Sequence, residues 1–209
     1  DKPLATELTE VAELIHLAKE RQLILTVGFN RRFAPLVQQL RNFSDKQEIS
    51  AIKNRPHELS TLDFQAYDLL IHSLDTALYL LDQPVDDISY DVKYQNDTLQ
   101  TAKIILKTSQ TTAVAGISLQ TGNDLEEIRL TTSDAIAAVN DLNSLSLRQN
   151  SHDQTILPDK WEPMLTTRGF APLIQAFLNA VATSGENPVS LESVYQSHRI
   201  ISELLQAQK

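Results

Sequence analysis

The sequence predicts an α+β (α/β) fold, with an open, mostly antiparallel sheet that carries helices on one face. The first observation is that the spacing of apolar residues changes from a helical period of about 3.6 to a strand period of about 2 near residue 84. The second is that short polar turns separate the strand-like segments that follow. The third is a helix followed directly by a short apolar segment at the start, an order typical of parallel sheets.

Residues 7–21 form the first predicted helix, with one apolar face made by Leu8, Val11, Ile15 and Ala18. Residues 23–27 are apolar, end at Gly28 and are predicted to be a buried strand. The first six residues contain no other strand for this segment to join. We therefore expect its partner strands upstream, in a longer parent protein.

The middle of the chain contains two further predicted helices and one strand. Pro35 suits the first turn of a helix that extends to about Phe43. Residues 49–55 alternate as a strand does. A long apolar helix is predicted from about Tyr67 to Leu81, closed by Asp82-Gln83-Pro84.

After residue 84 the sequence predicts an antiparallel meander, because connections this short join antiparallel neighbours. Residues 149–165, with little periodicity, are predicted to be a surface loop. Two helices end the chain, the second capped by Ser190. The predicted strands span residues 88–94, 98–107, 112–120, 125–131, 135–139 and 144–148.

Composition excludes several functional classes. The 209 residues carry a formal net charge of −9, which argues against a nucleic-acid partner. No apolar segment approaches the about 20 residues that a membrane span requires, and no signal segment is present at the N-terminus. The chain has no cysteine, so disulfides and thiolate chemistry are excluded. A cytoplasmic protein is expected.

The long predicted helix carries the most informative polar residues. Spacings of four and three place Asp68, His72 and Asp75 on one narrow stripe of an otherwise apolar helix. One interpretation is a solvated helix edge. However, Asp and His are poorer helix formers than the Lys, Glu and Gln usual on such edges. A carboxylate one turn from an imidazole can orient it as a general base, so the stripe is predicted to face a cleft.

Two other segments are candidates for the same site. Lys2, at the tip of a parallel strand, would point into the crevice where such sheets bind ligands, although a lysine before proline is often simply solvated. The segment from Gly28 to Phe33 follows the predicted strand and could line a site, although Arg31 and Arg32 could equally be solvated. The remaining histidines lack partners at ligand spacing and are expected to be structural or exposed: His16, His57, His152 and His198.

Three other chemistries have no support in the sequence. One helix offers too few carboxylates for an oxygen-rich metal site, so no metal is expected. The serine-hydrolase motif GxSxG does not occur. The five glycines stand too far apart for a dinucleotide fingerprint.

Taken together, these motifs resemble the glucose–fructose oxidoreductase/inositol dehydrogenase family (Gfo/Idh/MocA), in its C-terminal part without most of the Rossmann domain. The resemblance rests on Asp1-Lys2-Pro3, on the segment from Gly28 to Phe33, and on an Asp-x-x-x-His-x-x-Asp helix at 68–75, in that order. Three features depart from the family pattern, one of them Asn140-Asp141, which stands where a Gly-rich hairpin turn is common. Asp1 stands where glutamate is usual, and Gln65-Ala66-Tyr67 replaces a Gly-rich approach to the helix.

The resemblance implies roles for individual residues. Lys2, Asp68 and His72 would be catalytic, with His72 taking the proton of a substrate hydroxyl. Lys2 and Pro3 would border the cofactor, NAD or NADP, which the parent protein would bind and this chain alone would not. Asp75, Asn30 and Arg31 would contact substrate, with support of a substrate-contacting side chain as the alternative for Asp75.

The resemblance also implies a domain organisation. Residues 1–30 would be the end of a dinucleotide-binding domain, and residues 31–209 a substrate-binding and oligomerisation domain. The exposed sheet face would join subunits of a homo-oligomer. The alternating residues Ala113, Ala115 and Ile117 suggest such an apolar face.

The resulting hypothesis is the substrate-binding half of an NAD(P)-dependent oxidoreductase that acts on a secondary alcohol or ketone, such as a sugar or polyol. One rival is a non-catalytic ligand-binding or assembly protein that retains the fold, which the altered segment at 65–67 favours. A second is a free-standing dimerisation module. It would leave residues 7–27 without a sheet to join.

Overall fold

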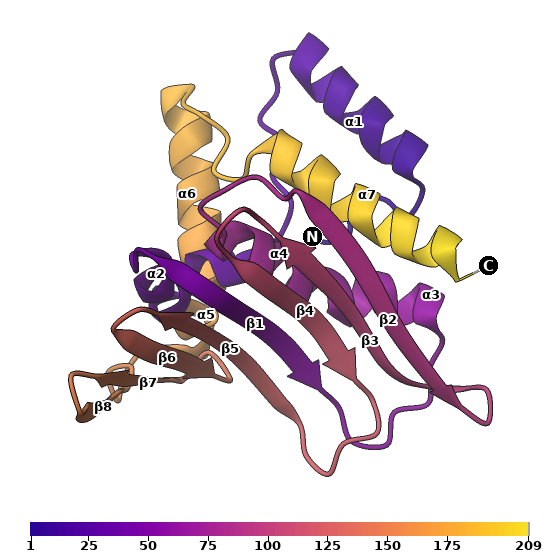
Figure 1. The fold of residues 1–209 in the computed structure, drawn as a ribbon. Coiled ribbons are helices and arrows are strands. Elements are labelled where there is room, and N and C mark those ends of the chain that lie inside the picture. Colours follow the sequence, from indigo (N-terminus) through magenta and orange to yellow (C-terminus); the bar gives the residue numbers. More distant parts are fainter. Residues whose placement is uncertain (209) are drawn as a thin grey trace.

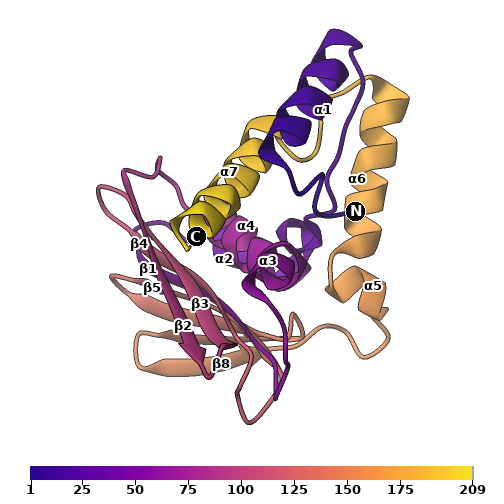
Figure 2. The same ribbon diagram turned by 90° about the vertical axis from the view of Figure 1, so that its right-hand side faces the viewer.

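The computed structural model describes residues 1–208 and has an open eight-stranded sheet with helices on one face (Figure 1, Figure 2). This confirms the predicted fold class. The strand order is β2-β3-β4-β1-β5-β6-β7-β8. The strands are β1 (Lys46–Asn54), β2 (Asp87–Gln95), β3 (Thr98–Lys107), β4 (Thr112–Ser118), β5 (Leu125–Thr132), β6 (Ala135–Asn140), β7 (Ser144–Gln149) and β8 (His152–Ile156).

The helices cover the sheet in successive layers. Helix α4 packs on β1 and β4, α7 packs on α4, and α1 packs on α7 (Figure 2). Within residues 1–208, every helix is too short or too polar to cross a membrane. The helices are α1 (Leu8–Glu20), α2 (Pro35–Arg41), α3 (Leu62–Gln65), α4 (Ile71–Leu80), α5 (Met164–Thr167), α6 (Phe170–Thr183) and α7 (Leu191–Ala207), with a 3₁₀ turn η1 (Asn30–Phe33) and a π-helical turn η2 (Ala66–Leu70).

The helix boundaries follow the sequence signals closely. The side chain of Ser190 accepts a hydrogen bond from the backbone N–H of Ser193, so the predicted cap of α7 is confirmed. Pro35 occupies the first turn of α2 as predicted. The long predicted helix begins earlier than Tyr67 and is interrupted, because η2 separates α3 from α4.

Residues 23–27 do not form the predicted strand. Val27 is buried, but Leu23 is exposed, and no strand among residues 1–208 lies beside this segment. A strand requires a hydrogen-bonded neighbour. The segment is therefore extended without being part of a sheet.

The predicted meander is wrong at one point, because β1 lies between β4 and β5. It pairs parallel with β4 and antiparallel with β5. Residues 119–124 are long enough to cross this gap, since two strand spacings amount to about 10 Å and each residue spans about 3.3 Å. The inward side chains of Ile49 and Ala51 are buried beneath the helices, which fixes the register of β1.

The predicted loop at 149–165 contains a strand and a short helix, β8 and α5. Strand β8 forms a hairpin with β7 through Asn150 and Ser151, whose φ values of 51° and 62° suit a tight hairpin turn. Four of the five β8 residues are exposed and lack apolar alternation. This is why its sequence did not indicate a strand.

The three alternating apolar residues of β4 that the sequence indicated face the helices and not the open side of the sheet. Ala113, Ala115 and Ile117 are at most 1% exposed and belong to the core. They therefore give no support to an apolar open face, which corrects the expectation. The open face instead carries the partly exposed side chains of Ile52, Ile105 and Val114.

Candidate functional site

Lys2 and Asp68 meet although they are far apart in the sequence. The ammonium of Lys2 lies 3.1 Å from the Asp68 carboxylate, and it also donates to the backbone carbonyls of Asp68 at 2.5 Å and Tyr67 at 3.2 Å. The Lys2 side chain is 13% exposed, so it is not the solvated lysine of the alternative interpretation. Both carbonyls belong to η2, and π-turns of this kind are frequent at functional sites.

His72 follows Asp68 by four residues, in the first turn of α4. Its Nδ1 atom is shielded from solvent and has no hydrogen-bond partner among residues 1–208. Burial lowers the pKa of His72 well below its ordinary value, and the positive charges of Arg31, Lys2 and Lys53 lower it further. The imidazole is therefore neutral near pH 7, the form that can accept a proton.

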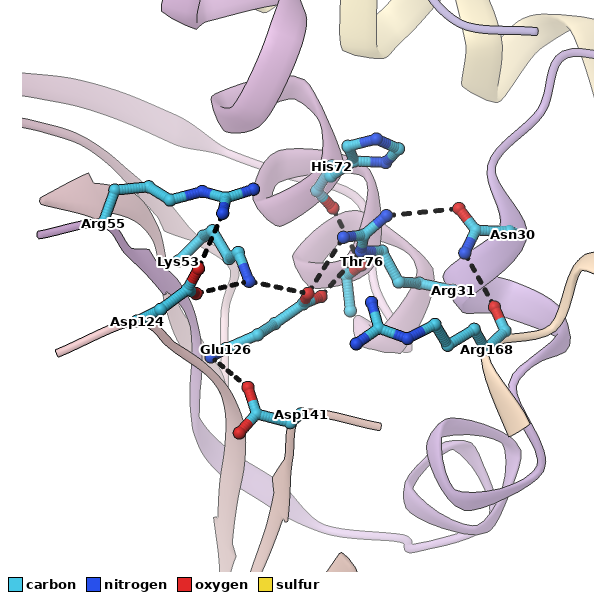
Figure 3. A network of polar contacts seen from close by, with 10 residues as sticks. All are labelled: Asn30, Arg31, Lys53, Arg55, His72, Thr76, Asp124, Glu126, Asp141 and Arg168. Carbon is cyan, nitrogen blue, oxygen red and sulfur yellow. Dashed lines mark hydrogen bonds and ion pairs between the residues drawn. The ribbon is translucent and has the colours of Figure 1, made fainter. Parts of the chain in front are cut away.

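Two of the cations around His72 are held by Glu126, whose side chain is 8% exposed (Figure 3). Arg31 donates two hydrogen bonds to this carboxylate, at 2.6 and 2.9 Å, and the Lys53 ammonium lies 3.7 Å from it. Burial raises the pKa of Glu126, but the charge and hydrogen bonds of Arg31, together with the charges of Lys53 and Arg168, outweigh this and lower the pKa below its usual value. Glu126 is therefore ionised at neutral pH.

A second carboxylate continues this network toward the end of the sheet. Asp124 accepts hydrogen bonds from Lys53 at 3.0 Å and from Arg55 at 2.6 Å (Figure 3). On the other side, the backbone N–H of Glu126 donates to Asp141 at 2.9 Å. The side chains beside His72 are thus fixed from several strands at once.

Asn30 links Arg31 to the segment before α6. Its Nδ2 donates to the Arg168 carbonyl at 2.7 Å, and its Oδ1 accepts from Arg31 at 3.2 Å. The residue is 2% exposed. Asn30 and Arg31 thus lie in the network beside His72, and Asn30 is placed to position Arg31.

Asp75 does not face a cleft, which corrects the expectation for the helix stripe. It is 1% exposed and accepts two hydrogen bonds from Arg32, at 2.9 and 2.6 Å. Burial raises its pKa, while Arg32 and Ser197 oppose this shift. The π-turn η2 rotates Asp68 relative to α4, and η1 places Arg32 over Asp75. Direct contact between Asp75 and a substrate is therefore not supported by the geometry.

Arg32 is likewise buried and not solvated. Its guanidinium lies 5.6 Å from the ring centre of Phe29 and 5.5 Å from that of Tyr79. Together with Asp75 it joins η1 to α4 in the interior.

Pro3 and the residues after it are fixed by His198 on α7. The Lys2–Pro3 peptide bond is cis. The backbone N–H of Leu4 donates to Nε2 of His198 at 3.1 Å, and Nδ1 of this ring bonds to the Val194 carbonyl at 2.7 Å. His198 is 1% exposed, so its predicted structural role is confirmed. Among residues 1–208, no group of three potential ligand side chains could hold a metal ion.

Sequence analysis missed Glu126, Lys53 and Arg168. A signal existed for Glu126, because it occupies an inward position of β5 together with Ile128 and Leu130. A carboxylate on the buried face of a strand requires a cationic partner. The sequence does not specify that partner, since it comes from a strand and a turn far away in the chain.

Comparisons with known proteins place this geometry in an oxidoreductase fold. A dehydrogenase (MviM) structure from Clostridium difficile superposes with a TM-score of 0.94 at 25% identity, covering 99% of this chain and 70% of that one. A Gfo/Idh/MocA family oxidoreductase from Vibrio cholerae shares the fold with a TM-score of 0.88 at 23% identity, covering 100% and 68%. UDP-N-acetylglucosamine 3-dehydrogenase of Acidithiobacillus ferrooxidans is 28% identical over 99% of this chain and 68% of its own length.

The fold and its neighbours define the C-terminal part of a Gfo/Idh/MocA-type oxidoreductase, which confirms the resemblance seen in the motifs. More particularly, the chain belongs to the YceM-like C-terminal domain family, whose model matches residues 35–150. The chain spans about two thirds of the length of the UDP-N-acetylglucosamine 3-dehydrogenase that it matches.

Proposed function

We propose that this chain is the substrate-binding and oligomerisation half of an NAD(P)-dependent oxidoreductase that acts on a secondary alcohol or ketone of a sugar or polyol. The observation that carries the proposal is the contact of Lys2 with Asp68 one turn before His72. Relatives named UDP-N-acetylglucosamine 3-dehydrogenase and myo-inositol 2-dehydrogenase support a hydroxyl-rich substrate.

The three side chains have complementary roles in this proposal. His72 is neutral at physiological pH and takes the proton of the substrate hydroxyl. The ammonium of Lys2 already donates to two carbonyls and to Asp68, and stabilises through its charge the negative charge that develops on the same oxygen. Asp68 holds the ammonium of Lys2 in place. In the reverse direction His72 returns the proton to the oxygen.

The residues present fit a nicotinamide cofactor. The unpartnered Nδ1 of His72 is a buried polar atom that a bound molecule could satisfy. Lys2 and Pro3 would border the cofactor from the N-terminal segment. When bound, the nicotinamide would accept the hydride of the carbinol carbon.

The proposed division into residues 1–30 and 31–209 has support in the exposed surfaces. The Leu25 carbonyl accepts a hydrogen bond from Asn187, but the backbone groups of Ile24 and Thr26 make none among residues 1–208 and remain able to pair with another strand. Exposed apolar residues lie on α1 (Leu14, Leu17) and α6 (Ile174, Leu178). A dinucleotide-binding domain joined to residues 1–30 would cover such surfaces.

The catalytic proposal is tested with a longer parent protein and a panel of sugars and polyols. Formation of reduced cofactor is measured by absorbance for the wild type and for His72→Ala. The variant is expected to lose about 10²–10⁴-fold in turnover, the usual contribution of a general base, at nearly unchanged cofactor affinity. Unchanged turnover would remove His72 from the mechanism. Micromolar dinucleotide binding by this chain alone would show that the cofactor site is misplaced.

The second candidate is a ligand-binding or assembly protein without catalysis. The approach to Asp68 is filled by side chains, since Gln65 is wholly buried and the hydroxyl of Tyr67 donates to the Thr6 carbonyl at 2.6 Å. Tight binding of one sugar by the parent protein, without hydride transfer from any member of the panel, would favour this candidate.

The open sheet face is proposed to join subunits of a homo-oligomer. The helices cover only the opposite side of the sheet (Figure 2). The centre of the open face carries the partly exposed side chains of Ile52, Ile105 and Val114. A charge at Ile105 would be buried without a partner in such an interface. Light scattering should therefore report a smaller particle for Ile105→Lys than for the wild type. An unchanged mass would exclude this face.

A further inference from the structure

We propose that a cavity beside the Arg31–Glu126 pair binds a neutral sugar unit that is linked to the unit oxidised at His72. The substrate would then be a glycoside of at least two sugar units. The inference rests on the proposed function for the position of the reacting unit. The cavity has a volume of about 510 Å³ and lies between the turn after β6 and the segment that leads into α6.

The cavity adjoins the His72 network through two residues of its wall. Asp141 accepts the backbone hydrogen bond of Glu126, and the carbonyl of Arg168 accepts from Asn30. Figure 3 shows both wall residues on the side of the Arg31–Glu126 pair that faces away from His72. A molecule with its reacting carbon at His72 would have to pass this pair to reach the cavity. A ligand that occupies both places must therefore extend beyond the reacting unit.

The charge of the cavity argues against a phosphate-bearing group. Its wall has three carboxylates and two cations, a net charge of −1 from 2 − 3: Asp141, Asp159, Glu162, Lys160 and Arg168. Burial raises the pKa of Glu126, whereas Arg31, Lys53 and Arg168 lower it. Glu126 therefore already balances part of the positive charge of Arg168. The whole chain is acidic as well, at −9. A diphosphate would therefore meet repulsion.

A neutral hydroxyl-rich ligand fits the same wall. Carboxylates accept hydrogen bonds from hydroxyls, cations donate them, and the amide of Asn143 does both. The Asn143 side chain is exposed and makes no hydrogen bond among residues 1–208. Leu157, Pro158 and Met164 supply apolar surface for the C–H face of a ring. Mixed lining of this kind orients a ligand without requiring it to carry charge.

Binding can be measured on this chain without cofactor or turnover. Calorimetry would compare cellobiose, maltose, lactose and diacetylchitobiose with glucose, N-acetylglucosamine, UDP and inorganic phosphate. Trp161 gives a second readout, because it is the single tryptophan and stands between the wall residues Lys160 and Glu162 with 95% of its surface exposed. At least one disaccharide should bind more tightly than its monosaccharide and change the Trp161 fluorescence.

Variants locate the binding. Asn143→Ala should weaken disaccharide binding by about fivefold, the usual effect of one lost hydrogen bond. Asn123→Ala, which changes an exposed asparagine in the turn before β5, should leave it unchanged.

Three results would overturn the inference. They are equal binding of mono- and disaccharides, binding of none of the sugars, and tight binding of UDP or phosphate that Asn143→Ala weakens. Since no hydride transfer is involved, failure of the catalytic proposal is a separate result, read from the parent protein.

Discussion

The ammonium of Lys2 lies 3.1 Å from the carboxylate of Asp68 although the two residues are 66 positions apart in the sequence. This contact ties the N-terminal segment to the helix that carries His72. The geometry is asymmetric, because Lys2 is largely shielded whereas the Asp68 side chain is 47% exposed. The ammonium also satisfies two carbonyls of the π-turn, so it has a structural as well as a proposed chemical role.

Replacing Lys2 should therefore cost more stability than replacing Asp68. Lys2→Met leaves the carbonyls of Tyr67 and Asp68 without a donor, and the free energy of unfolding should fall by about 2 kcal/mol. Asp68→Asn keeps both carbonyl contacts and removes only a half-exposed ion pair, which should cost less than about 1 kcal/mol. Urea unfolding measures both. Equal losses would mean that the carbonyl contacts contribute nothing.

The buried pair of Arg32 and Asp75 should behave differently when one or both members are removed. Asp75→Asn leaves a shielded guanidinium without its counter-charge and should lower the free energy of unfolding by about 3–5 kcal/mol. The double change Arg32→Met with Asp75→Leu should recover most of that loss, because no unpaired charge remains. Urea unfolding of the three proteins tests this.

A solvent-exposed pair provides the control. The Lys107 and Asp87 side chains are both more than half exposed, so Lys107→Gln should change stability by less than about 1 kcal/mol. A double variant no more stable than Asp75→Asn would show that this region needs the pair itself and not merely charge balance.

Local patterns predicted most elements, and nonlocal pairing accounts for most of the errors. Apolar periodicity was sufficient for α1, α7 and the strands from β2 to β7. The insertion of β1 between β4 and β5 depends on contacts between distant segments, which periodicity does not encode. Strand β8 has no buried side chain and is defined by its pairing with β7 alone.

The candidate site was partly predictable for the same reason. The spacing of Asp68 and His72 indicated a shared helix face, and Lys2 does reach Asp68. Spacing does not reveal which neighbour covers each residue of that face. Arg32 covers Asp75, and Glu126 arrives from β5 to hold Arg31. These partners follow from the tertiary fold.

Stability should fall as the pH drops below about 6.5, the ordinary histidine value. Burial lowers the pKa of His198, and also that of His72. Below pH 6.5 the unfolded chain takes up protons that the folded chain does not, so protonation favours unfolding. Each such histidine contributes up to about 1.4 kcal/mol per pH unit until its folded-state pKa is reached. Above pH 6.5 this contribution is constant.

Urea unfolding at pH 7.5, 6.5 and 5.5 measures that dependence. His198→Gln should show a shallower loss of stability between pH 6.5 and 5.5 than the wild type. His152→Gln changes an exposed histidine and is the matched control. If the wild type and His198→Gln lose stability in parallel, His198 does not remain neutral in the folded protein.

Gly169 connects the α6 segment to Asn30 and cannot accept a side chain. Its φ is +80°, and an added Cβ would lie 2.1 Å from the Asn30 carbonyl oxygen and 2.6 Å from the Ala34 nitrogen. Gly169→Ala therefore combines a strained backbone with a backbone clash, and should lower the free energy of unfolding by more than about 2 kcal/mol. Gly122→Ala, where an added Cβ meets nothing within 4 Å, should change it by less than about 0.5 kcal/mol.

Because Asn30 bonds to both Arg168 and Arg31, the shift at Gly169 should also disturb the cations beside His72. Similar urea midpoints for the two alanine variants would show that the close approach of Gly169 to the Asn30 carbonyl is not needed to hold Asn30.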